Sequence, residues 1–277
     1  MPASSTVRRV WALDAPELTV DCSILMLGTG GQEDTIPSPS FLVEHAEGLL
    51  LFDTSLATSG AGDPAAAYGP LADAFKISIP EHCRLDRQLE SIGCKTSDVR
   101  RIVLSHMHFD HTGGLDLFPH AEGFIGAGEL RYARTPSSLD AGFFREEDIA
   151  AAGKIAWNEV PAGYDHDMFG DGSVVLLSLH GHTPGTLGLK VRLPDESTLV
   201  LTSDAAHKRA NVEATTGMPF DVDRLNKNAS LQKVKLLRTQ PGTTVWISHD
   251  PRDWADFRPD NGEITSAAEL NRAAAQA

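Results

Sequence analysis

Cysteine and positive charge are both scarce in this chain of 277 residues. The three cysteines, Cys22, Cys83 and Cys94, form an odd and sparse set, so we interpret them as free thiols rather than as a disulfide framework. The 24 lysines and arginines face 38 aspartates and glutamates, which leaves a net charge of −14. This charge argues against nucleic acid and anionic membranes as partners, because both are held by clustered basic side chains.

Long apolar runs are also missing. No stretch approaches the roughly 20 apolar residues that a membrane span needs. Residues 1–26 lack a basic region followed by an apolar one, so we expect no signal peptide and a cytoplasmic location. A hydrophobic content of 41% and a charged content of 22% are ordinary for a globular protein, and we expect residues 1–277 to form a single domain.

Short apolar runs bounded by turn residues predict β-strands, and apolar residues at helical spacing predict helices. The predicted strands are residues 19–27, 41–44, 49–52, 101–104, 122–125, 174–179, 187–191, 199–202 and 244–247. The predicted helices are residues 84–93, 128–134, 223–238 and 264–275. Residues 57–80 are rich in Gly, Ala and Pro and are predicted to form an excursion, either a lid or a dimer loop.

Histidine and aspartate gather at the ends of these predicted strands. Four lie within six residues, and three more follow separately: His106, His108, Asp110, His111, then His182, Asp204 and His249. Burying so many polar groups in one loop for structural reasons alone is costly. Imidazole and carboxylate without thiolate suit zinc, manganese, iron or cobalt, so the pattern predicts a two-metal hydrolytic centre.

The same residues carry a family resemblance. The run 105–114, SHMHFDHTGG, resembles the signature of the metallo-β-lactamase superfamily, and the pieces at 181–185, 203–204 and 248–250 follow in that superfamily's order. Within it the chain most resembles the N-acyl-homoserine lactonases, over roughly residues 20 to 255. The resemblance implies an α+β fold, the αββα sandwich, in which two β-sheets pack face to face with helices on the outer faces. Strand runs followed by ligand loops in both halves of the chain fit this sandwich.

The resemblance also implies how the ligands divide. It assigns one metal to His106, His108 and His182, and the other metal to Asp110, His111 and His249. Asp204 bridges the two. The cofactors are therefore two divalent ions, with zinc expected and manganese, iron or cobalt as alternatives. Asp53 matches a superfamily aspartate that supports the ligand loop, against the alternative of a turn or cap residue. Asp250 either orients His249 or caps the following turn.

The implied reaction is the opening of a lactone ring by a hydroxide shared between the two ions. Asp110 is implied to pass a proton to the leaving ring oxygen. His207 stands where the lactonases commonly have a tyrosine that contacts the substrate carbonyl. An imidazole can also donate a hydrogen bond to a developing oxyanion, so we assign His207 a catalytic role, against the alternative of an exposed histidine without one.

The substrate partner is expected to be a small, uncharged lactone, held in a pocket of apolar side chains. We nominate Phe143, Phe144, Met218 and Phe220 for this pocket, with the pairs 26–27 and 168–169 as further candidates. Another lactone, an ester, a β-lactam or a thioester is the alternative substrate, and Lys208 and Arg209 could bind the carboxylates of a glutathione thioester. A di-iron redox protein or a non-catalytic metal-binding protein is the alternative class. The sequence does not decide between a monomer and a homodimer.

Overall fold

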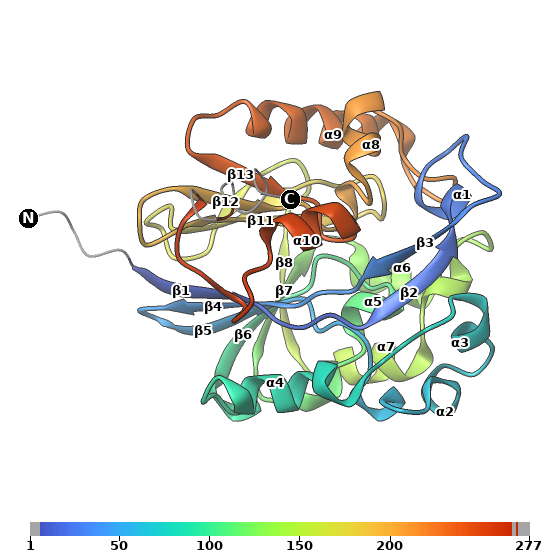
Figure 1. The fold of residues 1–277 in the computed structure, drawn as a ribbon, viewed down its shortest axis with the longest axis horizontal. Coiled ribbons are helices and arrows are strands. Elements are labelled where there is room, and N and C mark those ends of the chain that lie inside the picture. The colour runs from blue at the N-terminus through green and yellow to red at the C-terminus, as the bar shows by residue number, and fades with distance from the viewer. Residues whose placement is uncertain (1–5, 268–269, 271–277) are drawn as a thin grey trace, which may run out of the picture.

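The computed structural model describes residues 6–267 and residue 270. Two β-sheets face each other, and helices cover both outer faces (Figure 1). The larger sheet has the strand order β14-β1-β4-β5-β6-β7-β8, and the smaller one has the order β13-β12-β11-β10-β9. A separate two-stranded sheet pairs β2 with β3. The predicted αββα sandwich of the metallo-β-lactamase fold is confirmed.

The strands are β1 (Val7–Ala12), β2 (Glu17–Asp21), β3 (Glu33–Pro37), β4 (Phe41–His45), β5 (Gly48–Phe52), β6 (Val99–Val103), β7 (Glu122–Gly126), β8 (Ala156–Val160), β9 (His166–Asp167), β10 (Val174–Ser178), β11 (Leu187–Arg192), β12 (Thr198–Leu201), β13 (Thr243–Trp246) and β14 (Glu263–Ile264). The α-helices are α1 (Cys22–Leu25), α2 (Pro64–Tyr68), α3 (Pro70–Ala74), α4 (Leu85–Ser91), α5 (Phe109–Thr112), α6 (Glu129–Arg134), α7 (Glu146–Ala152), α8 (Arg209–Ala214), α9 (Arg224–Arg238) and α10 (Pro251–Phe257). The described residues also form the 3-10 helices η1 (Thr58–Gly60), η2 (Glu81–Cys83), η3 (Thr96–Asp98), η4 (Leu115–Leu117), η5 (Ala141–Phe143) and η6 (Ser203–Ala205).

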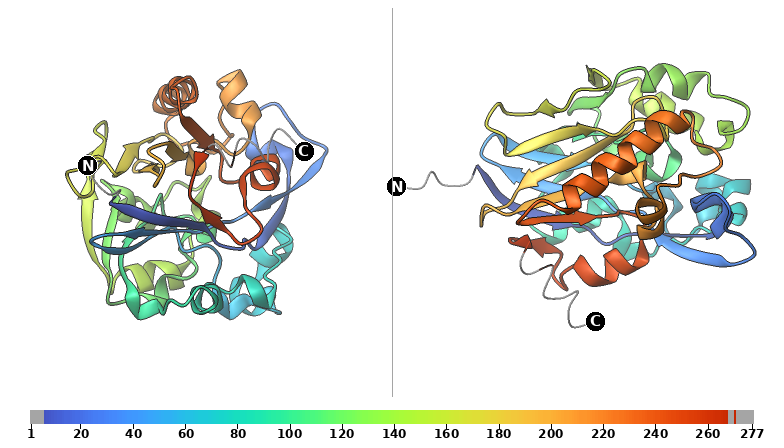
Figure 2. Two further views of the ribbon diagram at one scale, coloured as in Figure 1. Left: turned by 60° about the vertical axis from the view of Figure 1, so that its left-hand side comes forward. Right: turned by 90° about the horizontal axis from the view of Figure 1, so that it is seen from above.

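The core has one apolar layer between the sheets and one under the helices on each outer side. Strand alternation produces this division, because successive side chains point to opposite faces of a sheet. In β5, Leu50 and Phe52 join the layer between the sheets, whereas Leu51 packs toward Leu85 and Leu89 of α4. On the other side, α9 lies across the smaller sheet (Figure 2, right) and buries its apolar face against it.

Parallel pairing brings the functional loops to one edge of the sandwich. Strands β5 and β6 run parallel with Phe52 opposite Val103, and β12 and β13 run parallel with Leu201 opposite Trp246. The loops that follow the carboxyl ends of parallel strands therefore lie side by side. Asp53 and the histidine cluster leave the larger sheet at this edge, and Asp204 and His249 leave the smaller one.

Most predicted elements are confirmed within one or two residues, and the exceptions have local causes. The strand predicted over 19–27 is wrong in its second half, because Asp21 accepts a hydrogen bond from the Ser23 N–H and starts α1 there. Residues 57–80 fold into the short helices α2 and α3, and Tyr68 at the end of α2 is buried. The helix predicted over 264–275 lies mostly outside the described residues, and Ile264 belongs to β14.

Two further predictions concern the cysteines and membrane-spanning segments. The three cysteines are free, as expected. Among residues 6–267 and 270, no helix has the length and apolar character that crossing a membrane requires.

Candidate metal centre

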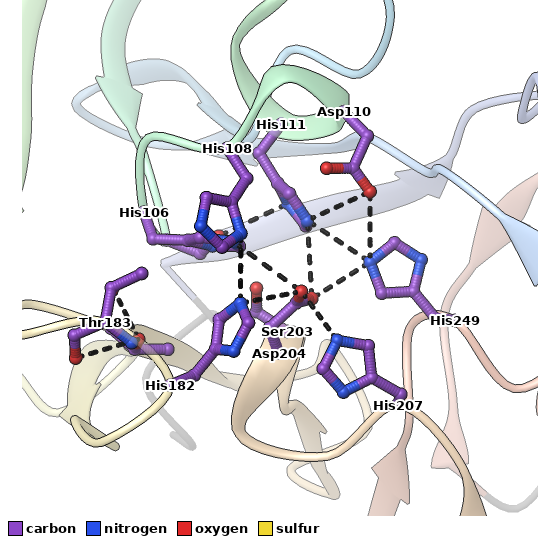
Figure 3. A network of polar contacts seen from close by, with 12 residues as sticks. His106, His108, Asp110, His111, His182, Thr183, Ser203, Asp204, His207 and His249 are labelled. Carbon is purple, nitrogen blue, oxygen red and sulfur yellow. Dashed lines mark hydrogen bonds and ion pairs between the residues drawn. The ribbon is translucent and has the colours of Figure 1, made fainter. Parts of the chain in front are cut away.

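The histidine cluster is held by its own apolar neighbours. After β6 ends at Val103, the chain passes through an extended stretch and turns into α5. Met107 and Phe109 alternate with the polar residues and are buried, so they anchor this loop in the core. His106, His108 and His111 are buried as well, and their rings face one another at the sheet edge (Figure 3).

The Asp204 carboxylate lies between two groups of ligands, with one oxygen toward each. Its Oδ2 lies 3.2 Å from Nε2 of His182 and 3.6 Å from Nε2 of His106. Its Oδ1 lies 2.9 Å from Nε2 of His249 and 3.3 Å from Nε2 of His111 (Figure 3). The structure thus gathers His106, His108, His182 and Asp204 as one possible ligand group, and Asp110, His111 and His249 as the other.

Each group is completed by a further contact. Nδ1 of His108 lies 3.1 Å from Nε2 of His182 in the first group. In the second group, Oδ2 of Asp110 lies 3.6 Å from Nε2 of both His111 and His249, and these two nitrogens are 3.2 Å apart. Seven side chains therefore converge from loops that are distant in the sequence.

Outward hydrogen bonds fix which imidazole nitrogen faces the centre. Four histidines are held through Nδ1, by Ser105 Oγ for His106 (3.0 Å), Asp53 Oδ2 for His111 (2.8 Å), Asp221 Oδ1 for His182 (3.2 Å) and the Pro37 carbonyl oxygen for His249 (2.6 Å). Their Nε2 atoms are left for a central group, and Nε2 of His106 is buried without a hydrogen-bond partner. Hydrogen bonds to the outer nitrogen select the tautomer and orientation of metal-ligating histidines.

The electrostatics also suit divalent cations. Burial, reinforced by the neighbouring His111, lowers the pKa of His106 well below its ordinary value, which keeps the imidazole in the neutral form that binds metal. Burial works to raise the pKa of Asp204, but His207 and His249 hold it well below its ordinary value, so its carboxylate is ionised. Burial acts to lower the pKa of His111, His182 and His249 too, but the neighbouring carboxylates of Asp110 and Asp204 raise it above its ordinary value. A divalent cation replaces a proton at such ligands, so the residues present fit two metal ions held by imidazoles and carboxylates.

Asp53 supports the ligand loop from behind. Its Oδ1 accepts a hydrogen bond from the Ser105 N–H (2.7 Å), and its Oδ2 accepts one from Ser105 Oγ (2.8 Å) while facing His111. Asp53 is buried and has φ of 59°, a conformation uncommon outside glycine. Ser203, directly before Asp204, shares this feature with φ of 45°. A positive φ therefore occurs both at the residue that supports the ligand loop and at the residue before Asp204, and such sparsely populated backbone geometry is typical of functional sites.

Three supporting residues escaped the sequence analysis. The fully buried Glu129 accepts hydrogen bonds from the N–H groups of Met107 (3.1 Å) and Gly185 (2.9 Å), so it ties together the two loops that carry the first group of histidines. Asp221 contacts His182, and Lys227 contacts both Asp221 and the main chain of Asp204. Nothing in the local sequence distinguishes these residues from ordinary surface charges, because their partners come from other parts of the chain.

His207 and Asp250 lie close to the centre but face specific partners. Nε2 of His207 lies 2.9 Å from Oδ2 of Asp204, and its ring stacks on that of His249. His207 is buried rather than exposed, and a proton on Nε2 is donated to Asp204. Its expected role toward an oxyanion stays a prediction. Asp250 accepts hydrogen bonds from the N–H groups of Arg252 and Arg209, which is the capping alternative for this residue.

An apolar pocket opens beside the candidate ligands. Its polar floor includes Asp110 and His207, and its walls are apolar: Leu18, Val20, Ile24, Leu25, Ile36, Phe75, Phe109, Phe143 and Met218. The β2–β3 hairpin with α1 supplies much of this wall, and the sequence pattern had not predicted this contribution.

Only some of the nominated pocket residues lie in this wall. Phe143 and Met218 do. Phe144 instead packs in the core with its ring near His108. Phe220 does not line the pocket, but its ring packs against that of Phe143, which does. The 168–169 nomination is wrong, because both side chains pack against the layer between the sheets. The pair 26–27 is displaced by one residue, since Leu25 lines the pocket.

Comparison with known families agrees with this geometry. The chain matches the Metallo-beta-lactamase superfamily over residues 34–249 and belongs to that superfamily. Among curated relatives, it is 31% identical to the N-acyl homoserine lactonase AttM of Azorhizobium caulinodans, over 92% of this chain and 97% of the relative.

Solved structures share the fold. The chain is similar to a B. thuringiensis AiiA mutant with N-decanoyl-L-homoserine bound at its active site, with a TM-score of 0.80 and 22% identity over 94% of this chain and 100% of that one. It is also similar to AidC, described as a dizinc quorum-quenching lactonase, with a TM-score of 0.63 and 19% identity over 90% and 92% of the two chains.

Proposed function

We propose that this protein is a dinuclear metal-dependent hydrolase that opens lactone rings, with N-acyl homoserine lactones as its substrates. The observation that carries the proposal is the placement of Asp204, whose two carboxylate oxygens each face a separate histidine group. A bridging carboxylate of this kind suits a two-metal hydrolytic site. The lactonase names of its relatives support the substrate class, and the dizinc description of AidC supports zinc over manganese, iron or cobalt.

In this proposal His106, His108, His182 and Asp204 would hold one ion, and Asp110, His111 and His249 would hold the other with Asp204 shared. When bound, two divalent ions activate water for attack and polarise a substrate carbonyl oxygen. The chain orients the ligands through Asp53 and Asp221. Asp110 also lines the pocket, which supports a role for its carboxylate in passing a proton to the leaving ring oxygen.

The pocket favours a neutral acyl group over an anionic one. None of the described residues that line it is lysine or arginine. The two basic candidates for a glutathione thioester are engaged elsewhere, Lys208 with Asp34 and Arg209 with Asp253 and Asp256. An apolar wall stabilises an alkyl or acyl chain by burying its surface, whereas it leaves a carboxylate unpaired.

A different lactone is the second candidate substrate, and His207 is the observation that favours it. The lactonases that this chain resembles commonly have tyrosine at this position. His207 contacts Asp204 with Nε2, so the polar group offered to a substrate carbonyl differs from a phenol.

The single domain over 1–277, the cytoplasmic location and the homodimer remain predictions from the sequence.

A panel assay tests the proposal. Zinc-loaded protein is given homoserine lactones of several acyl lengths, simple lactones, aryl esters, a glutathione thioester and a β-lactam, and acid release is followed in a pH-stat. We expect the highest kcat/KM for an N-acyl homoserine lactone. A higher value for another lactone would shift the substrate assignment to the second candidate, and turnover of the thioester or β-lactam alone would overturn both.

A further inference from the structure

A buried lysine lies directly behind the candidate metal centre. Lys227 occurs near the start of α9, and its side chain is only 1% exposed. Its Nζ donates a hydrogen bond of 2.6 Å to the main-chain carbonyl oxygen of Asp204 and lies 3.2 Å from Oδ1 of Asp221. Burying an ammonium group is costly unless it is paired and hydrogen-bonded, and Lys227 has both kinds of partner here.

The Asp221 carboxylate joins this lysine to a candidate ligand and to the pocket. Its Oδ1 lies 3.2 Å from Nδ1 of His182, on the side of the imidazole away from the centre. Its Oδ2 accepts a hydrogen bond of 2.8 Å from the N–H of Met218, which lines the pocket. One carboxylate therefore contacts the ligand, the lysine and the pocket wall.

Main-chain hydrogen bonds hold the loop of His182 against the segment that leads into α9. The N–H of Val222 donates to the carbonyl oxygen of His182 (3.1 Å), and the N–H of Asp223 donates to that of Gly181 (2.9 Å). Gly181 has φ of 131°, and a Cβ there would lie 2.2 Å from the main-chain nitrogen of Lys227. The loop that carries His182 is thus packed directly against the start of α9, with no room for a side chain between them.

This arrangement serves one group of ligands only. In the second group, Nδ1 of His111 is held by Asp53 and Nδ1 of His249 by the carbonyl oxygen of Pro37. Asp204 is shared, but its contact with Lys227 is through the main chain rather than the carboxylate. A change at Asp221 should therefore act first on the site that contains His182.

We propose that Asp221 and Lys227 are a positioning pair that fixes His182 and the Asp204 main chain for the first metal ion, and that couples this ion to the Met218 wall of the pocket. This role presupposes the dimetal centre proposed above, but not its substrate. Metal affinity reports on it directly, so a failure of the lactone assay leaves the test intact.

The test compares zinc binding by wild-type protein and three variants, Asp221→Ala, Asp221→Asn and Lys227→Met, in titrations against a chromophoric chelator. For Asp221→Ala we expect one of the two ions to bind about 10- to 100-fold more weakly, the usual effect of removing the hydrogen-bond partner of a metal-ligating histidine. Asp221→Asn should lose less, because its amide oxygen can still accept from Nδ1 of His182. Lys227→Met should weaken the same ion.

The affected ion is identified in a His249→Ala background, which lacks a ligand of the second group. There Asp221→Ala should weaken the remaining tight ion by the same factor. The double variant Asp221→Asn with Lys227→Met buries no unpaired charge, so it keeps the test possible if a single variant fails to fold.

Asp148→Asn is the matched control, since Asp148 forms another buried ion pair, 3.0 Å from Nη1 of Arg145. It should alter thermal stability while the ion held by His182 binds with wild-type affinity, because the carboxylate of Asp148 accepts a hydrogen bond from Thr112, next to the second-group ligand His111, and does not contact the loop of His182. The positioning role is overturned if folded Asp221→Ala binds both ions as wild type does, if it loses both equally, or if Asp148→Asn loses the same ion.

Discussion

Oδ2 of Asp53 lies 2.8 Å from Nδ1 of His111, at the end of the imidazole opposite the nitrogen that faces Asp204. The same carboxylate receives both hydrogen bonds of Ser105. One buried aspartate thus sets the orientation of a candidate ligand and the path of the loop that carries three others.

Replacing Asp53 by Asn should lower kcat/KM for the lactone by about 10- to 100-fold. Asparagine tolerates the positive φ at this position, so the backbone should be retained while the charged acceptor behind His111 is lost. Steady-state kinetics and zinc content measured on the same preparation check this. Wild-type values for both would show that Asp53 has no part in orienting the ligand.

Lengthening the acyl chain of the substrate should lower KM, because the pocket wall is built from apolar side chains such as Val20 and Ile36. Each methylene that becomes fully buried contributes about 0.8 kcal/mol, which corresponds to a decrease of up to roughly fourfold per methylene. Initial rates for a series from butanoyl to decanoyl homoserine lactone measure the effect. A KM independent of chain length would remove this pocket as the acyl site.

The stability of the fold should depend on pH through Asp148. Burial raises the pKa of Asp148 to about 6, although the nearby Arg145 acts to lower it. Between about pH 4 and pH 6 the folded protein then binds more protons at this group than the unfolded chain. The contribution is fully present below about pH 4 and is lost as the pH rises through 6.

Asp148→Asn should remove this dependence. Between pH 4.5 and pH 7, the free energy of unfolding of the variant relative to wild type should increase by on the order of 2 kcal/mol, whatever constant offset the lost Arg145 pair causes. Urea denaturation of both proteins at the two pH values provides the comparison. If the difference between the proteins is the same at both pH values, the raised pKa of Asp148 is wrong.

The sequence identified the residues that meet at the centre because they follow strands that end at one edge of the sandwich, through parallel pairing for β6 and β12 and through the antiparallel order β12-β11-β10 for β10. His106, His182 and Asp204 each follow an apolar run that is readable without a structure. Their division into two groups came from family resemblance rather than from spacing, and the positions of the two Asp204 oxygens agree with it.

Residues that act from behind the centre were not readable in this way. Lys227 appears in the sequence as one of several charges on an amphipathic helix, and only the packing of α9 against the 181–182 loop buries it. The prediction of the pocket residues was partly wrong for the same reason. Phe169 has the apolar character of a pocket residue, but its ring stacks on that of His45.

The proposed dimetal lactonase activity is tested most directly by adding zinc back to metal-stripped protein and measuring the hydrolysis of an N-acyl homoserine lactone. We expect no turnover without metal, a rise that reaches its plateau at two ions per chain, and no turnover by Asp204→Asn at the same zinc concentration. Near-normal turnover in the stripped protein, or none with two ions bound, would contradict the account.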